Sequence, residues 1–273
     1  GDVRLSGRSD FTISMWIFPK GTEPYQTLYR QEADVRGSFG LGFRFIKHGD
    51  DEGYLYFGFN NQSTSWQNAF PWNDSASLAN ITKIPVNQWS HVALTKSGKS
   101  VKLYANGKKY YEMILDDTHF YVPAPNQTNI SIGGTSAVNQ FFCGRMDEIQ
   151  FWNMALTPDE IKAWMYRSID CSHEKYANLI YYYKLNQNSG TTVIDSKGFY
   201  DGTMVNMTDA NWVVSDVKEW TVDAGSILNG ELVGSYADGS STDGTNRNLT
   251  FEIVEQAKKG TATITGGNKF EYR

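Results

Sequence analysis

The sequence lacks the features that mark several common classes of protein. Its 273 residues contain only two cysteines and four histidines, and the histidines show no regular spacing. A disulfide-rich framework and a zinc site built from a short histidine motif are therefore not expected. No stretch approaches the roughly 20 apolar residues that a membrane-spanning helix needs. Nucleophile elbows, phosphate-binding loops and dinucleotide-binding fingerprints are also missing, which argues against the enzyme classes that carry them.

Positive charge is scarce and dispersed. The formal net charge is −5, and no basic run is longer than the Lys108-Lys109 or Lys258-Lys259 pair. Because nucleic acids and anionic membranes are bound by clustered Lys and Arg, we expect neither as a partner. The chain starts at Gly1, almost inside a predicted strand, and we therefore expect a fragment of a longer protein.

The sequence is instead rich in signals for short β-strands. Aromatic residues make up 14% of the chain, and 25 glycines supply turns. Asn106-Gly107 is a strong signal for a tight hairpin. Apolar residues alternate with polar ones in several stretches, which include Phe11, Ile13, Met15 and Ile17, Val92 and Leu94, and Val101 and Leu103. This pattern predicts an all-β fold of many antiparallel strands.

One helix is well marked after Leu156. Thr157 is suited to the N-cap, Pro158 to the first helical position, and Glu160 completes a capping box. Leu156 and Ile161 have the spacing of a hydrophobic staple. We therefore predict a short helix that lies on a sheet.

Four segments carry a family resemblance. GRMDEIQFWNMALTPDEI (144–161) joins a strand to the predicted helix, and FTISMWIF (11–18), NQWSHVALTKSGKSVKLYANGK (87–108) and LIYYYKLNQNSGTTVIDSKGFYDGTMV (179–205) accompany it. Together they resemble bacterial laminin-G-like domains, which are concanavalin A-like and also similar to pentraxins. The resemblance implies a jelly-roll sandwich with one short helix.

Segment 179–205 is similar to the opening segment of that family, yet it follows the helix. It either closes the same sandwich as a permuted strand pair or begins a second copy that is not completed. The first and last strands of a sandwich are neighbours, and no second FTISMWIF follows. We therefore favour closure, and we assign residues 1–217 to the jelly-roll domain.

Residues 218–273 differ in character, because their aromatic density is lower. An acidic, glycine-rich loop, ADGSSTDGTNRN, is followed by LTFEI and KGTATITGGNKFEY. This order resembles bacterial cadherin-like tandem repeats, which normally continue through further strands. We therefore predict a partial cadherin-like β domain in this part of the chain.

The laminin-G-like resemblance implies a bound Ca²⁺ where Asp195 meets the strand that carries Asp147, with Asp201 as a further ligand. The alternative is that Asp195 and Asp201 form turns through side-chain to backbone hydrogen bonds. Asp238 and Asp243 resemble the calcium loop of cadherin-like repeats, although they also fit an ordinary polar loop.

Three aromatic residues, Trp66, Phe70 and Trp72, lie among Asn and Gln in segment 59–75. This segment has no periodicity and contains a proline, so we predict a loop. Sugars are recognised by an aromatic platform together with amides and carboxylates. The three residues are therefore candidates for carbohydrate binding, although one or two of the rings could instead anchor the loop.

Cys143 and Cys171 bracket the predicted helix. A disulfide between them would pin the helix to the sheet, and two buried free thiols would fit the spacing equally well. We predict the disulfide, because the remainder of the sequence has the character of a secreted protein.

The arrangement of the carboxylates in the sequence does not indicate a catalytic site. Retaining glucanases with this type of sandwich place their acids at E-x-D-x-x-E on one strand, whereas Asp147 and Glu148 are adjacent. Adjacent strand residues are expected to face opposite sides, so this pair is not expected to work together. We do not expect an enzyme.

The sequence therefore predicts a non-catalytic binding or adhesion module of a larger bacterial surface or secreted protein. We expect it to be extracellular and monomeric, with a glycan or a cell-surface protein as partner and Ca²⁺ supporting the loops. The alternatives are a structural spacer in a multi-domain stalk and an accessory carbohydrate-binding domain of a polysaccharide-degrading enzyme.

Overall fold

The computed structural model describes residues 5, 8–21, 23–32, 39–48, 50–60, 66–68, 83–115, 130–135, 139–215, 228–231, 261–266 and 269–272. The chain divides into two compact units, Gly1–Val217 and Lys218–Arg273. These bounds coincide with the division made from the sequence.

The first sheet has the strand order β14-β13-β1-β7-β8-β9, and every pairing in it is antiparallel. Its strands are β1 (Asp10–Pro19), β7 (Ser90–Ser97), β8 (Ser100–Ala105), β9 (Lys108–Ile114), β13 (Gly144–Trp152) and β14 (Leu179–Tyr183). Its strands come from both ends of the larger unit.

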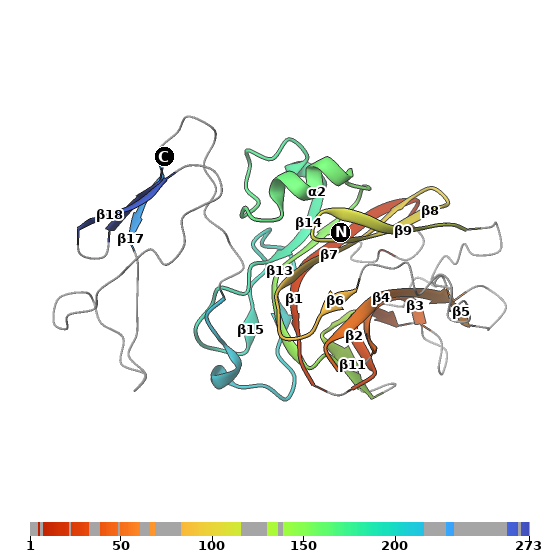
Figure 1. Cartoon of the computed structure of the whole chain (residues 1–273). Coiled ribbons are helices and arrows are strands. Elements are labelled where there is room, and N and C mark those ends of the chain that lie inside the picture. The colour runs from red at the N-terminus through yellow and green to blue at the C-terminus, as the bar shows by residue number, and fades with distance from the viewer. Residues whose placement is uncertain are drawn as a thin grey trace. The chain divides into compact units, whose positions relative to one another are not determined.

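The second sheet has the order β10-β2-β3-β4-β5, with β6 paired to β4. Its strands are β2 (Tyr25–Glu32), β3 (Phe39–His48), β4 (Glu52–Asn60), β5 (Trp66–Asn68), β6 (Ile84–Pro85) and β10 (Ile130–Ile132). Figure 1 shows the two sheets as separate layers of the larger unit. The predicted concanavalin A-like jelly-roll sandwich is therefore confirmed.

The main core lies between these sheets. The ring centroids of Tyr29 on β2 and Phe151 on β13 are 5.4 Å apart, so the sheets are in direct contact. Each buried aliphatic side chain contributes about 1.5–3 kcal/mol to folding. Fully buried members of the core include Ile13, Met15, Ile17, Leu28, Phe43, Phe45, Leu55, Val92 and Leu94.

Helix α2 (Pro158–Trp164) covers the other side of the first sheet. Thr157 is its N-cap, and Thr157 and Glu160 form the predicted capping box. Leu156 and Ile161 are buried in a second apolar cluster that also contains Trp152. The predicted helix is therefore confirmed. Of the helices in the described ranges, none has the length and apolar character that a membrane span requires.

Strand β14 closes the first sheet. It pairs antiparallel with β13 along Ile149 to Trp152, so segment 179–205 belongs to the same sandwich rather than to a second copy. Downstream of β14, the short strands β15 (Thr192–Val193) and β16 (Gly202–Thr203) form a small hairpin. The remaining short elements of this unit are β11 (Gly134–Thr135), β12 (Gln140–Phe141), η2 (Tyr176–Asn178) and η3 (Asp209–Asn211).

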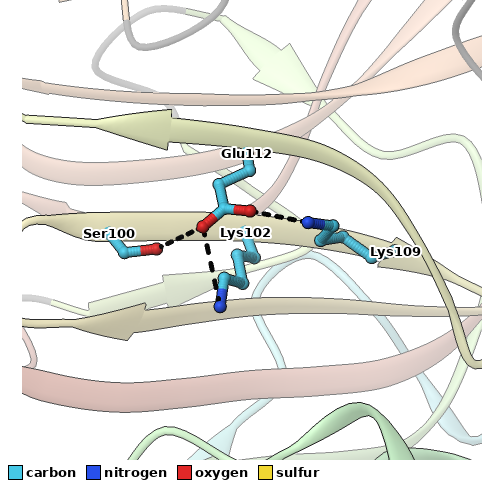
Figure 2. A network of polar contacts seen from close by, with 4 residues as sticks. All are labelled: Ser100, Lys102, Lys109 and Glu112. Carbon is cyan, nitrogen blue, oxygen red and sulfur yellow. Dashed lines mark hydrogen bonds and ion pairs between the residues drawn. The ribbon is translucent and has the colours of Figure 1, made fainter.

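The hairpin of β8 and β9 turns at Asn106 and Gly107, whose φ angles of 48° and 74° fit the predicted tight turn. An exposed polar network lies on this hairpin and is shown in Figure 2. Glu112 accepts hydrogen bonds from Ser100 and Lys109 at 3.0 and 2.6 Å, and it lies 3.6 Å from the Lys102 ammonium group. Exposed ion pairs of this kind add little stability.

The unit 218–273 contains three described strands, β17 (Leu228–Glu231), β18 (Ala262–Gly266) and β19 (Lys269–Tyr272). They form an antiparallel sheet in the order β17-β19-β18. The cadherin-like character of this unit stays a prediction.

The predicted disulfide is not formed, because Cys143 and Cys171 are both free and exposed. Cys143 lies against Gly21 just before β13 begins, whereas Cys171 lies near His173, which contacts Trp152 at the far end of β13. The nine residues of β13 span about 26 Å, and a disulfide requires Cα atoms within about 7 Å. The alternative of two buried thiols is also wrong.

Candidate functional site

The sequence predicts a loop for segment 59–75, which contains the candidates for carbohydrate binding. In the structure, part of this segment belongs to the second sheet. Trp66 begins β5, which pairs with the end of β4 so that Trp66 is opposite Asn60. The expectation of a loop is therefore wrong at Trp66. Phe70 and Trp72 lie outside the described residues.

The register of the second sheet defines a face opposite the one that packs on the first sheet, and the described members of this face are buried as well. Phe43, Phe45 and Leu55 occupy the side that faces the first sheet. Their neighbours along β3 and β4 occupy the opposite side. We call this opposite side the Arg30–Arg44 face; its described members include Arg30, Gly42, Arg44, Tyr54, Tyr56 and Gly58. Trp66 and Asn68 occupy register positions on the same face, because Asn68 pairs with Gly58.

Two arginines dominate this face. Arg30 is 2% exposed and Arg44 is 8% exposed. Arg30 pairs with Gly42, two residues before Arg44 on β3, so the two arginines are diagonal neighbours with Cβ atoms about 7 Å apart. Tyr56 lies directly opposite Arg44 on β4, and the Arg44 guanidinium carbon is 5.8 Å from the centre of its ring. This is the geometry of a cation–π contact.

The surroundings of Arg44 disfavour its positive charge. Burial is the largest cause that lowers the pKa of Arg44, to about 10, and the charge of Arg30 acts in the same direction. Tyr56 and Tyr25 oppose the shift.

Two glycines and a serine lie in the same cross-strand row as Arg30. Gly42 and Gly58 are paired across β3 and β4, and Ser131 on β10 flanks Arg30 on the other side. The row from Ser131 to Gly58 therefore has Arg30 as its one long side chain, and both glycines in it are buried.

Glu52, the acid at the start of β4, forms an ion pair with a lysine. Glu52 forms an ion pair with Lys83 at 3.4 Å, and the Lys83 ammonium lies 5.9 Å from the centre of the Tyr54 ring. Glu52 is four residues from Tyr56, which corresponds to about 13 Å along the strand. Its charge is thus balanced at the opposite end of the Arg30–Arg44 face.

The predicted calcium ligand Asp195 has a different role in the structure. Its carboxylate is 2% exposed and accepts four backbone N–H bonds, from Tyr182 and Lys197 at 2.9 and 3.0 Å and from Phe199 and Tyr200 at 3.2 Å each. A carboxylate offers about four lone-pair sites, so these donors leave no free site for Ca²⁺. Asp195 therefore fits the alternative of a turn-forming residue.

Asp201 supports the same turn, since its Oδ1 accepts the backbone N–H of Asp195 at 2.9 Å. In the described part of the chain, no group of three or more His, Cys, Asp or Glu residues could hold a metal ion. Asp147 thus has no such group there with Asp195 and Asp201. Asp238 and Asp243 lie outside the described residues, and calcium binding by them stays a prediction.

The adjacent acids Asp147 and Glu148 lie in a β-bulge. The register between β1 and β13 shifts after Ser14, and Glu148 has a φ angle of 51°. Strict alternation does not hold across a bulge, so the reason for expecting the two acids on opposite sides is removed. Both are buried; Asp147 accepts the backbone N–H of Glu148, and Glu148 accepts a hydrogen bond from the Tyr182 hydroxyl.

A small cavity lies between α2 and the first sheet. Its lining includes His91, His173, Trp152 and Trp164, and the His173 ring lies 4.9 and 4.5 Å from the two tryptophan rings. Its volume of about 10 Å³ is enough for about one water molecule. A sugar ring would not fit.

The sequence did not indicate the buried pair Arg30 and Arg44. The one local signal was the triplet Phe43-Arg44-Phe45, in which a charged residue lies between two aromatic ones. Nothing local indicated that the two arginines share a face, because that follows from the pairing of β2 with β3.

The two stacked antiparallel sheets and the short helix on the first of them define a concanavalin A-like β sandwich. Residues 1–162 match the concanavalin A-like lectin/glucanases superfamily, and the chain belongs to this family. A solved structure of a protein from Bacteroides ovatus ATCC 8483, proposed to bind carbohydrate, is similar with a TM-score of 0.51. The two share 23% identity over 71% of this chain and 51% of that chain, which shows the fold alone.

Two curated relatives match shorter stretches. Jeltraxin from Lepidobatrachus laevis is 32% identical over 85 residues, which are 29% of this chain and 38% of jeltraxin. Pappalysin-1 from Mus musculus is 31% identical over 74 residues, which are 27% of this chain and 5% of pappalysin-1. The matched part therefore spans well under half of either relative.

Proposed function

We propose that this chain is a non-catalytic carbohydrate-binding module that acts in adhesion within a larger extracellular protein. The observation that carries the proposal is the concanavalin A-like sandwich itself, whose second sheet places Trp66 at the start of β5. Aromatic rings that stack on sugars and donors that bind hydroxyl groups are the usual components of a glycan site.

The fold relatives support this choice. The family includes lectins, and the similar Bacteroides ovatus protein has been proposed to bind carbohydrate. The buried acids Asp147 and Glu148 belong to the first sheet and are engaged in hydrogen bonds there. They are not on the Arg30–Arg44 face, which fits a site that binds rather than cleaves.

A glycan array followed by titration calorimetry tests the proposal. The whole chain should bind at least one saccharide, and Trp66→Ala should weaken that binding at least about tenfold. Trp164→Ala is the matched control, because Trp164 lies on α2 against the other sheet. Absence of signal from the folded protein on a broad array would reject a carbohydrate-binding role and leave a structural spacer.

The same experiment separates an adhesion module from an accessory domain of an enzyme. An accessory domain should bind the polysaccharide that a catalytic domain of its parent chain degrades. A cell-surface adhesin should instead bind host or neighbour-cell glycans. Calcium support is part of the proposal through Asp238 and Asp243, and a melting temperature measured with Ca²⁺ and with chelator tests it.

A further inference from the structure

A second candidate binding surface lies at one end of the first sheet, around the ring of Phe18. Its other members are Lys20, Trp89 and Arg145, and we call these four residues the Phe18 cluster. We infer that the Phe18 cluster is a separate site that binds the carboxylate or sulfate group of an acidic saccharide. The inference goes beyond the proposed function, because the cluster lies at strands of the first sheet, whereas Trp66 belongs to the second.

Strand pairing brings the members of the cluster together. Phe18, near the end of β1, is directly opposite Arg145 on β13. The guanidinium carbon of Arg145 lies 5.3 Å from the centre of the Phe18 ring, and the ammonium nitrogen of Lys20 lies 5.4 Å from the same centre. The Trp89 ring packs edge-on against Phe18, with ring centroids 5.5 Å apart. Two cations and two aromatic rings therefore meet at one end of the sheet.

Backbone hydrogen bonds fix the positions of these residues. The N–H of Lys20 donates to the carbonyl of Cys143 at 2.6 Å, which extends the pairing of β1 with β13 beyond the end of β1. The N–H of Asn87 donates to the carbonyl of Pro19 at 2.8 Å, which holds the segment before β7, and with it Trp89, beside the end of β1. Little backbone freedom has to be lost when a ligand binds, which favours affinity.

The two cations are accessible and are not paired with an acid. All four members of the cluster are half-buried. Within the described part of the chain, neither Lys20 nor Arg145 forms an ion pair with a carboxylate. Asp147, the next acid along β13, is 6% exposed and accepts the N–H of Glu148. An anionic group on a ligand would therefore balance two positive charges that lie on one small area of the surface.

An acidic saccharide matches this combination of groups. The Arg145 guanidinium offers N–H donors in a fixed fork that fits the oxygens of a carboxylate or a sulfate, and Lys20 adds a second positive charge. A pyranose ring has a flat apolar side that can pack on an aromatic ring such as Trp89. Asn87 and Gln88 are exposed beside it in sequence, and their amides can bind hydroxyl groups. The cluster should therefore prefer an acidic saccharide to a neutral sugar and to an inorganic anion.

The two free cysteines supply a reporter and an internal control, since both are exposed. Cys143 continues the pairing of β1 with β13 opposite Lys20, and directly opposite residues share a face of the sheet. A ligand on the Phe18 cluster would therefore hinder reagents at Cys143. Cys171 lies near His173, at the far end of β13, and should not be affected.

Alkylation of the whole chain by neutral iodoacetamide, followed by mass spectrometry, provides the first test. The probes are an oligogalacturonate, a chondroitin sulfate oligosaccharide, a neutral galactan oligosaccharide and inorganic sulfate. At twice its dissociation constant, at least one acidic oligosaccharide should slow the alkylation of Cys143 about threefold by mass action and leave Cys171 unchanged. The neutral oligosaccharide and inorganic sulfate should have little effect at the same concentration. The two acidic probes distinguish carboxylate from sulfate.

Variants provide the second test, with affinity measured by titration calorimetry. Arg145→Gln should weaken binding of the acidic probe at least about tenfold, and Arg145→Lys should restore only part of it, because lysine keeps the charge without the fork. Lys102→Gln is the matched control, since it removes the same charge from an exposed ion pair of the first sheet and should change affinity less than about twofold. Trp66→Ala should leave the protection of Cys143 unchanged. Melting temperatures verify that each variant is folded.

Each outcome supports or overturns the inference. Equal slowing at both cysteines, slowing at neither, or equal protection of Cys143 by the neutral probe or by inorganic sulfate would overturn it. An equal loss in Lys102→Gln and Arg145→Gln would show that net charge alone is responsible, and it would reject the site. If Arg145→Gln does not fold, the alkylation of wild-type protein still decides.

The outcomes also separate this site from the proposed glycan site. Loss of Cys143 protection in Trp66→Ala would show that the two are one site, and it would overturn the inference. Protection that persists in Trp66→Ala supports a separate site. Failure of the array signal that depends on Trp66 would reject that glycan site, and the alkylation result would be unaffected.

Discussion

The backbone N–H of Tyr182 donates a 2.9 Å hydrogen bond to Oδ1 of Asp195. Tyr182 lies in β14, which closes the first sheet, and Asp195 lies two residues after the short strand β15. One buried carboxylate therefore ties this segment to the sheet, and the same carboxylate organises the turn through Lys197, Phe199 and Tyr200.

Asp195→Asn should destabilise the larger unit by about 2–3 kcal/mol. The substitution replaces one acceptor oxygen with an amide NH₂, which faces backbone N–H groups that then lose their acceptor. Urea unfolding followed by fluorescence would measure the loss. Asp209→Asn is the control, because Asp209 is exposed and its Oδ1 accepts the backbone N–H of Gly190 at 2.8 Å. Equal losses for the two variants would contradict the structural role of Asp195.

The effect of Asp195→Asn should not depend on calcium. All four lone-pair sites of its carboxylate are occupied by N–H donors, so Ca²⁺ has no site to stabilise there. We expect the same decrease in melting temperature for this variant in Ca²⁺ and in chelator. A decrease seen only in Ca²⁺ would show that Asp195 is a calcium ligand after all.

Stability should fall in mild acid because of His91. Burial lowers the pKa of His91 from 6.5 to about 3. Between these values the unfolded chain binds a proton at this residue and the folded chain does not, so stability is lost as the pH falls below about 6.5. His91→Gln should have a smaller difference in melting temperature between pH 7.5 and pH 5.0 than the wild type.

The other titratable groups around that cavity are His173 and Glu160. Burial also lowers the pKa of His173, so His173→Gln should reduce the acid sensitivity in the same direction. An unchanged pH dependence in both variants would contradict the assignment of acid sensitivity to this cavity.

Thr157→Ala should loosen α2. Its Oγ1 accepts the backbone N–H of Glu160 at 3.2 Å, and loss of such a cap costs about 1 kcal/mol. Hydrogen exchange should speed up in the amides of α2 and change little in the second sheet. Thr157→Ser keeps the hydroxyl group and should behave as wild type. Equal exchange in both variants would show that the cap adds nothing.

Local signals were sufficient for several elements. The cap at Thr157, the turn at Asn106-Gly107 and the alternation in β1 all depend on residues close in sequence, and each predicted its element correctly. The closure by β14 was also predicted, because the resemblance and the adjacency of terminal strands agreed.

Features that depend on pairing between distant strands were missed. The bulge at Glu148 arises from a mismatch between β1 and β13, and sequence periodicity along β13 does not contain that information. The same holds for the meeting of Arg30 with Arg44 and for the inclusion of Trp66 in β5. The prediction of a disulfide was wrong, because the number of residues between Cys143 and Cys171 does not reveal that the nine-residue strand β13 separates the two thiols in space.

The position of β14 limits how this protein can be shortened. The family match ends at residue 162, but β14 (Leu179–Tyr183) supplies the last hydrogen-bonded neighbour of β13. A recombinant chain cut soon after α2 would present the N–H and C=O groups of β13 to solvent, and uncovered strands of this kind recruit other chains. We expect such a chain to aggregate or to form intermolecular sheets, whereas one that extends past Asp195 should remain dispersed.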